Sequence, residues 1–126
     1  MYSKFGQFID GKWQPSHKKE TYDVFNPANE ELIGKSSKAS SVDVEKALKS
    51  AQKGFHVWKK FSPWDRALII RKIADLIRKK NNELAKWMTL ETGKPFSEGL
   101  AEASASADIF EWNSEETKRI YGQTVE

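Results

Sequence analysis

The chain has 126 residues, of which 38% are hydrophobic, 31% are charged and 12% are aromatic. That length supports one modest core, and the aromatic content argues against disorder. The absence of cysteine excludes disulfides, thiolate metal sites and a cysteine nucleophile within these residues. The sequence has no apolar run long enough to span a bilayer, and Met1–Phe5 lacks the apolar region of a signal peptide. We therefore expect a cytoplasmic protein without a membrane partner.

Residues 1–40 have the pattern of two β-hairpins. The dipeptide Asp10-Gly11 is a strong two-residue turn signal, with Phe5, Phe8 and Ile9 before it and Trp13 on the return strand. A second pair of strands is expected around Asn26-Pro27, with Tyr22, Val24 and Phe25 on one arm and Leu32-Ile33-Gly34 on the other. Isolated hairpins are marginal in water, so this region needs a surface to lie against.

Four helices are predicted over residues 41–122. The first begins with Ser41 as its N-cap and runs to about Lys59. Its apolar face is the series Val44, Ala47, Leu48, Ala51 and Phe55. The second begins with Ser62 as cap and Pro63 at the first helical position, with Asp65 placed for a near capping box.

The third and fourth predicted helices meet at Gly93. Asn81-Asn82 breaks the second helix and caps the third, which stops at Gly93 in a left-handed conformation. Pro95 can open the fourth helix, expected over roughly 96–120. The small residues between Ala101 and Ala107 would let another backbone approach closely.

The predicted fold class is mainly α with N-terminal β-hairpins, an α+β fragment with antiparallel helices. We expect a single partial domain over residues 1–126. Its parts are a hairpin region at 1–40, a four-helix region at 41–122 and a truncated strand that opens at 123–126. That strand has no partner left in the sequence.

The residues do not indicate a catalytic, cofactor-binding or metal site. His17 and His56 are the two histidines, and neither has a second ligand at suitable spacing. Lys94 follows a glycine, but the phosphate-loop pattern around it is absent. Glu98 and Glu102 share a helix face, yet solvation or ion pairing is the simpler interpretation of the acidic fourth helix. Pairing with Lys118 and Arg119 is the favoured form.

Basic clusters such as Arg78-Lys79-Lys80 fit a solvated helix face. With a net charge of +3, the chain carries too little excess positive charge to require nucleic acid, and we expect no nucleic-acid partner.

Three sequence motifs resemble the start of an NAD(P)-dependent aldehyde dehydrogenase. They are Phe8-Ile9-Asp10-Gly11-Lys12-Trp13, then Asn26-Pro27-Ala28, then Trp58 followed by Arg66. The run Leu90-Glu91-Thr92-Gly93-Lys94-Pro95 is similar to the family's N-terminal signature. The tail from Asp108 to Gly122 is similar to the succinate-semialdehyde branch.

The resemblance implies a longer enzyme that oxidises an aldehyde, here succinate semialdehyde, with NAD or NADP. It implies a cofactor domain, a cysteine nucleophile and a glutamate base, all outside these residues. We therefore expect the 126-residue chain to be inactive alone, an N-terminal fragment that binds no cofactor. In the family the fourth helix borders the substrate entrance, which makes Ala101, Ser104, Ala105 and Trp112 candidate lining residues. Alternatively, Ala101 and Ala105 simply permit close helix packing.

A second hypothesis is a non-enzymatic oligomerisation or interaction module derived from that family. Four amphipathic helices would expose apolar surface that missing domains would otherwise cover. This hypothesis predicts self-association or pairing with full-length subunits.

Overall fold

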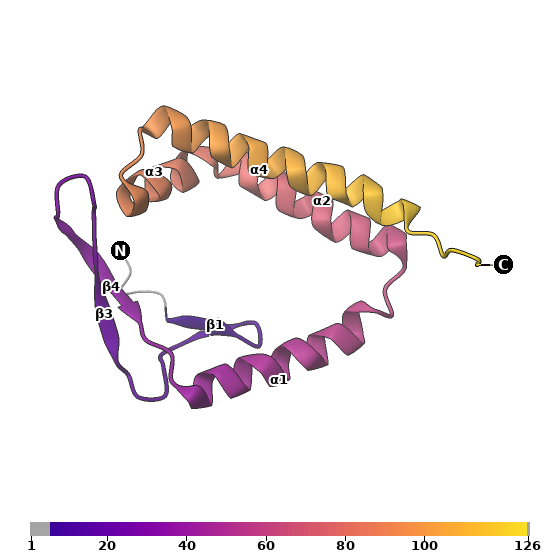
Figure 1. Ribbon diagram of the computed structural model, residues 1–126, viewed down its shortest axis with the longest axis horizontal. Helices are drawn as coiled ribbons and strands as arrows, with labels where there is room; N and C mark the ends of the chain where they lie inside the picture. The colour runs from indigo at the N-terminus through magenta and orange to yellow at the C-terminus, as the bar shows by residue number, and fades with distance from the viewer. Residues whose placement is uncertain (1–5, 126) are drawn as a thin grey trace. The chain divides into compact units, whose positions relative to one another are not determined.

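The computed structural model describes residues 6–125 (Figure 1). Met1–Phe5 and Glu126 lie outside the described residues, as do the predicted roles of Phe5 in the first hairpin and Glu126 in a strand. Within that range the elements are two hairpins, four α-helices and a short 3-10 helix, so the predicted class is confirmed. The chain divides into two compact units, Met1–Val57 with Leu90–Gly93 and Trp58–Thr89 with Lys94–Glu126. The single partial domain stays a prediction.

The first hairpin consists of β1 (Gln7–Ile9) and β2 (Lys12–Gln14). Ile9 pairs with Lys12, so the loop is the two-residue turn predicted from the sequence. Asp10 has φ 54° and Gly11 has φ 75°, the left-handed values that a type I′ turn requires at both positions. The cross-strand pair of Phe8 and Trp13 has ring centroids 5.1 Å apart, which fixes the register of the short ladder.

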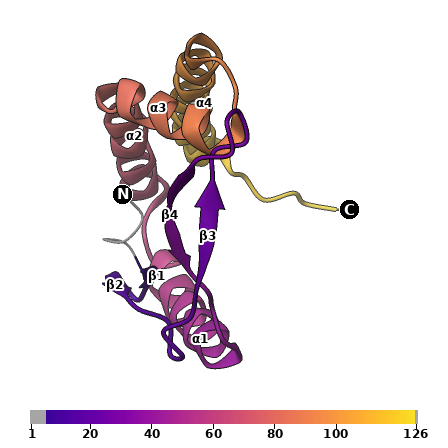
Figure 2. The same cartoon turned by 90° about the vertical axis from the view of Figure 1, so that its left-hand side faces the viewer.

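The second hairpin consists of β3 (Thr21–Phe25) and β4 (Leu32–Ser37), paired antiparallel as expected (Figure 2). Its loop is built around Asn26. The Asn26 side-chain oxygen accepts a hydrogen bond from the Ala28 N–H at 3.0 Å, and the Asn26 N–H donates to the Glu31 carbonyl at 2.8 Å. This side-chain turn explains why Asn followed by Pro marks the change of direction.

Helix α1 (Ser41–Trp58) is capped by Ser40, not by Ser41 as predicted. The Ser40 N–H donates to the Asp43 carboxylate at 2.9 Å and the Ser40 hydroxyl donates to it at 2.7 Å. The His17 N–H donates to the same carboxylate at 3.0 Å, which ties the loop after β2 to the start of the helix. Both serines can cap, but Ser40 alone has a carboxylate three residues downstream, and this capping box decides the boundary.

Helices α2 (Pro63–Lys79) and α3 (Asn81–Thr92) follow. The predicted cap of α2 is confirmed, since the Ser62 hydroxyl accepts from the Asp65 N–H at 3.1 Å and Pro63 is the first helical residue. Helix α3 begins at Asn81 as predicted, but the Asn81 amide donates to the Ser104 hydroxyl at 2.7 Å and does not cap the helix. Gly93 has φ 74° and is the predicted left-handed stop.

Helix α4 (Phe96–Glu116) ends four residues earlier than predicted and continues as the 3-10 helix η2 (Thr117–Arg119). The Thr117 hydroxyl donates to the Asn113 carbonyl at 2.8 Å, which satisfies a terminal carbonyl in place of a further α-turn. Residues 120–125 form no regular element, so the predicted strand opening is not formed in the part of the chain that the structure describes. A strand without a partner lacks the hydrogen bonds that would hold it extended.

Helices α2 and α4 pack side by side and antiparallel, as predicted (Figure 1). Arg71 on α2 meets Glu115 late on α4, whereas Arg78 meets Asp108 earlier. The fully buried apolar side chains of the described residues are all alanines: Ala67, Ala74, Ala85, Ala103 and Ala107. A Cβ placed on Gly99 would lie 2.9 Å from the Ala85 carbonyl oxygen, so the predicted close approach occurs at Gly99 on α4.

Large apolar side chains are exposed on both units. On α1, Val44 is 49% exposed and Leu48 and Phe55 are each 60% exposed, so the predicted apolar face of this helix is uncovered. None of the described helices is long and apolar enough to cross a membrane.

Candidate functional site

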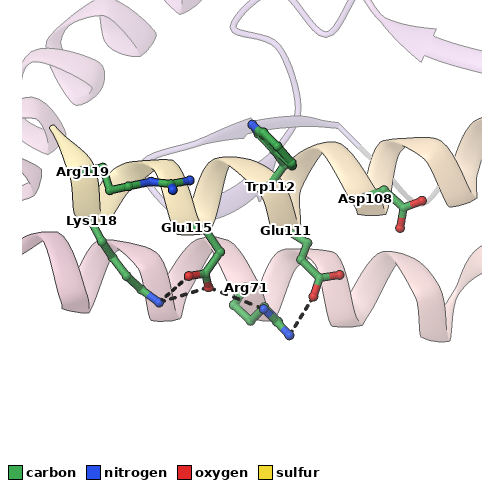
Figure 3. A pocket seen from close by; sticks show the side chains of 7 residues that line it. All are labelled: Arg71, Asp108, Glu111, Trp112, Glu115, Lys118 and Arg119. Atoms are coloured by element: carbon green, nitrogen blue, oxygen red, sulfur yellow. Dashed lines mark hydrogen bonds and ion pairs between the residues drawn. The ribbon is translucent and has the colours of Figure 1, made fainter.

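The largest described hollow on the second unit lies along α4 and has a volume of about 700 Å³ (Figure 3). One predicted site residue, Trp112, lines it and is 69% exposed. The remaining lining residues are charged: Arg71, Asp108, Glu111, Glu115, Lys118 and Arg119. In Figure 3 the indole of Trp112 points away from Arg71, while Glu111 and Glu115 point toward it.

The charges around this hollow are paired with one another. The Arg71 guanidinium lies 2.7 Å from the Glu111 carboxylate and 3.7 Å from that of Glu115. The Lys118 ammonium lies 2.9 Å from Glu115, and Arg119 pairs with Glu116. The pairing of acidic residues with Lys118 and Arg119 that the sequence favoured is therefore confirmed.

Arg78 extends this ladder of ion pairs one step along α2. Its guanidinium lies 2.8 Å from the Asp108 carboxylate and also pairs with Glu111. The hydrogen bond from Arg78 to Asp108, and then that to Glu111, raises the pKa of the arginine above its ordinary value. The hydrogen bond from Lys118 lowers the pKa of Glu115, with Arg71 adding to the effect. These carboxylates stay ionised at neutral pH, so they serve the helix pair and not proton transfer.

The ladder was missed at the level of sequence, although a signal for it was present. Arg71 and Arg78 are seven residues apart and so lie two turns apart on one face of α2. Glu111 and Glu115 are four residues apart and lie on one face of α4. Two complementary faces on helices predicted to be antiparallel identify such a contact.

The other candidate lining residues lie elsewhere on α4. Ala101 and Ala105 are exposed. Ser104 is exposed, and its hydroxyl donates to the Leu100 carbonyl at 3.0 Å and accepts from Asn81. The structure does not bring these three residues to the hollow beside Trp112, and their role at a substrate entrance stays a prediction.

Acid–base and metal chemistry have no site among residues 6–125. No group of three or more histidine, aspartate or glutamate side chains there is placed to hold a metal ion. The carboxylates of Glu98 and Glu102 do not form a working pair, because Glu102 is bound to Lys94.

Comparison with known proteins decides the family, since residues 13–126 match the model of the aldehyde dehydrogenase family. The chain belongs to the aldehyde dehydrogenase family. It is 36% identical to glutarate-semialdehyde dehydrogenase of Pseudomonas aeruginosa over 118 residues, which cover 94% of this chain and 24% of that protein. It is 37% identical to the NADP(+) succinate-semialdehyde dehydrogenase of Escherichia coli over 117 residues, which cover 93% of this chain and 24% of that protein.

Solved aldehyde dehydrogenases have the same fold over this segment. An NADP-dependent enzyme of E. coli superposes with a TM-score of 0.91 at 36% identity, covering 98% of this chain and 26% of that one. Betaine aldehyde dehydrogenase of Staphylococcus aureus, solved with NAD+, superposes with a TM-score of 0.90 at 31% identity, covering 95% and 25%. The chain thus spans about a quarter of the length of these aldehyde dehydrogenases.

The described residues do not fit a dinucleotide. The hollow beside Trp112 presents carboxylates, which would repel a pyrophosphate, and its cations are already paired with them. The sequence also has no Gly-x-Gly-x-x-Gly loop to cradle phosphates. No step of a reaction is therefore assigned to a cofactor on these residues.

Proposed function

We propose that this chain is the N-terminal part of an NAD(P)-dependent dehydrogenase that oxidises succinate semialdehyde to the acid. The observation that carries the proposal is the match of 93% of the chain, at 37% identity, to an NADP(+) succinate-semialdehyde dehydrogenase. A semialdehyde substrate is favoured further because glutarate-semialdehyde dehydrogenase is similar at nearly the same identity.

In this proposal the segment serves as scaffold for the enzyme and supplies none of its chemistry. The chain has no cysteine, so it cannot provide a thiolate nucleophile. Its densest cluster of charged groups is the α2–α4 ladder, in which every carboxylate already has a cationic partner. We expect the ladder to fix the register of two helices whose buried contacts are alanines, because such small side chains specify register weakly.

A turnover assay tests the proposal. The purified 126-residue chain and a longer polypeptide that contains it are each mixed with succinate or glutarate semialdehyde and with NAD+ or NADP+. Formation of reduced cofactor is followed by absorbance. We expect turnover by the longer polypeptide, fastest with succinate semialdehyde, and none by the chain alone. Cofactor reduction by the pure 126-residue chain would contradict the scaffold role.

A second candidate function is a non-enzymatic interaction module that self-associates or pairs with full-length subunits. It is favoured by the uncovered row of Val44, Leu48 and Phe55 on α1. Burial of such a row removes apolar area from water at about 25 cal/mol per Å². In sedimentation velocity this candidate predicts an association that Leu48→Glu weakens.

Val57→Glu is the matched control for that experiment. Val57 is 54% exposed and lies on the opposite side of the same helix, nine residues from Leu48. The two variants carry the same added charge on one element. A monodisperse monomer at high concentration, or equal weakening by both variants, would count against the interaction module.

A further inference from the structure

A row of lysines runs along α1 on the side that adjoins the first hairpin. Lys46, Lys49 and Lys53 are three and four residues apart, so their side chains lie on adjacent turns of one helix face. They line a hollow of about 390 Å³ whose other walls are Ile9, Asp10, Gln14 and Ser50. All of these residues belong to one compact unit.

The tip of the hairpin is fixed against the small side chains of α1. The Ser50 hydroxyl donates to the Asp10 carboxylate at 3.3 Å. Ala47 and Ala51 line a neighbouring hollow together with Phe8 and Gly11, and Figure 2 shows β1 and α1 lying side by side. The lysine row therefore forms one wall of a recess whose opposite wall is a tight turn.

The three ammonium groups have no ion pair with any carboxylate of residues 6–125. The lysines that do form ion pairs in this range are Lys35, Lys38, Lys80, Lys94 and Lys118. Glu45 precedes Lys49 by four residues, the favourable orientation for a helical ion pair, yet the two do not pair and Lys49 lines the hollow. Uncompensated like charges on adjacent turns oppose the helix, and an anion between them removes that repulsion.

The two carboxylates beside the row already have other partners. Asp10 accepts from Ser50, and Asp43 accepts from Ser40 and from the His17 N–H. Lys46 influences Asp43 electrostatically and helps to lower its pKa, but it does not approach within ion-pair distance. The positive charge of the row is therefore left for a ligand from solution.

We propose that this hollow is a binding site for a phosphate-class oxyanion. The three ammonium groups supply charge, and the Ser50 hydroxyl lies on the same wall for a hydrogen bond. The Asp10 carboxylate repels an anion at the turn, which places the ligand toward Lys46, Lys49 and Lys53. Free phosphate and the phosphate group of a larger metabolite share this chemistry. The site is independent of the proposed dehydrogenase activity.

A titration followed by amide chemical shifts tests the site. The labelled 126-residue chain receives inorganic phosphate in one arm and glycerol phosphate in the other, at constant low ionic strength. We expect saturable shifts at Gln14 and along 46–53. Tighter binding of glycerol phosphate identifies a phosphomonoester as the ligand, and tighter binding of phosphate identifies the free ion. Absence of saturable shifts in both arms overturns the proposal.

Charge-matched variants separate a site from general attraction. Because exposed ion pairs contribute modestly, the triple substitution Lys46→Gln, Lys49→Gln and Lys53→Gln is expected to weaken binding about tenfold. The control Lys60→Gln, Lys72→Gln and Lys79→Gln removes the same charge elsewhere and leaves binding unchanged. Equal weakening by both triples refutes the site. Should the first triple lose its helical circular dichroism, Lys49→Gln alone decides by the same criterion.

Discussion

Gly99→Ala is predicted to destabilise the chain although alanine is the better helix former. Within a helix, alanine is favoured over glycine by about 1 kcal/mol. At Gly99, however, the new Cβ would lie 2.9 Å from the Ala85 carbonyl oxygen and 3.2 Å from the Ala85 Cα. Restoring an ordinary contact of about 3.5 Å requires the α3 backbone to move by about 0.6 Å.

The obstacle at Gly99 is backbone and not a flexible side chain, so the whole turn of α3 has to move. Overpacking of this kind costs about 1–3 kcal/mol. Subtracting the gain in helix propensity leaves a net loss of about 0–2 kcal/mol, and we expect a clear decrease in the urea midpoint.

Gly54→Ala is the matched control. Gly54 is also inside a helix, and a Cβ there meets no atom within 4 Å. It therefore receives the propensity term without the clash and should stabilise the chain by about 1 kcal/mol. The measurement is urea unfolding followed by circular dichroism for the parent chain and both variants. If Gly99→Ala stabilised the chain as much as Gly54→Ala, the close approach of α3 and α4 would be refuted.

Three further substitutions test the local structure. Ser62→Ala should lower stability to urea by about 1 kcal/mol through loss of the α2 cap, and an unchanged midpoint would contradict that cap. Gly93→Ala should cost about 1–2 kcal/mol, because φ is 74° there and Pro27 crowds the new Cβ at 3.2 Å; a neutral result in thermal unfolding would refute the left-handed stop. Asp43 has a pKa lowered chiefly by the Ser40 N–H hydrogen bond, so its contribution is present above its unfolded value of about 3.9 and is lost as pH falls through the lower folded value. Asp43→Asn should therefore unfold at lower urea than the parent at neutral pH, with the gap closing in acid, whereas a gap that is constant with pH would contradict the clamp.

Features encoded by a few neighbouring residues could be predicted from the sequence. The Asp10-Gly11 turn, the Ser62-Pro63 start of α2 and the Gly93 stop each depend on the conformation of one or two residues. Where two neighbours offered the same chemistry, as at Ser40 and Ser41, the deciding contact was the Asp43 carboxylate, which the His17 N–H also uses. That second contact joins residues 26 positions apart and is not visible in a local pattern.

Features that depend on packing could not be predicted. Periodicity identified an apolar face on α1, but it cannot tell whether anything covers that face, and Leu48 is 60% exposed. The same holds for the candidate site. Trp112 could be placed on α4 from the sequence, whereas its position beside the Arg71–Glu111 pair depends on the docking of α2.

The central claim is that this segment works as part of a longer dehydrogenase. The most direct test is the mass of the natural gene product in the source cells, detected with an antibody against this segment. We predict a product several times heavier than 14.4 kDa, in keeping with relatives of which this chain spans about a quarter. A product of 14.4 kDa would contradict the claim and would favour the interaction module.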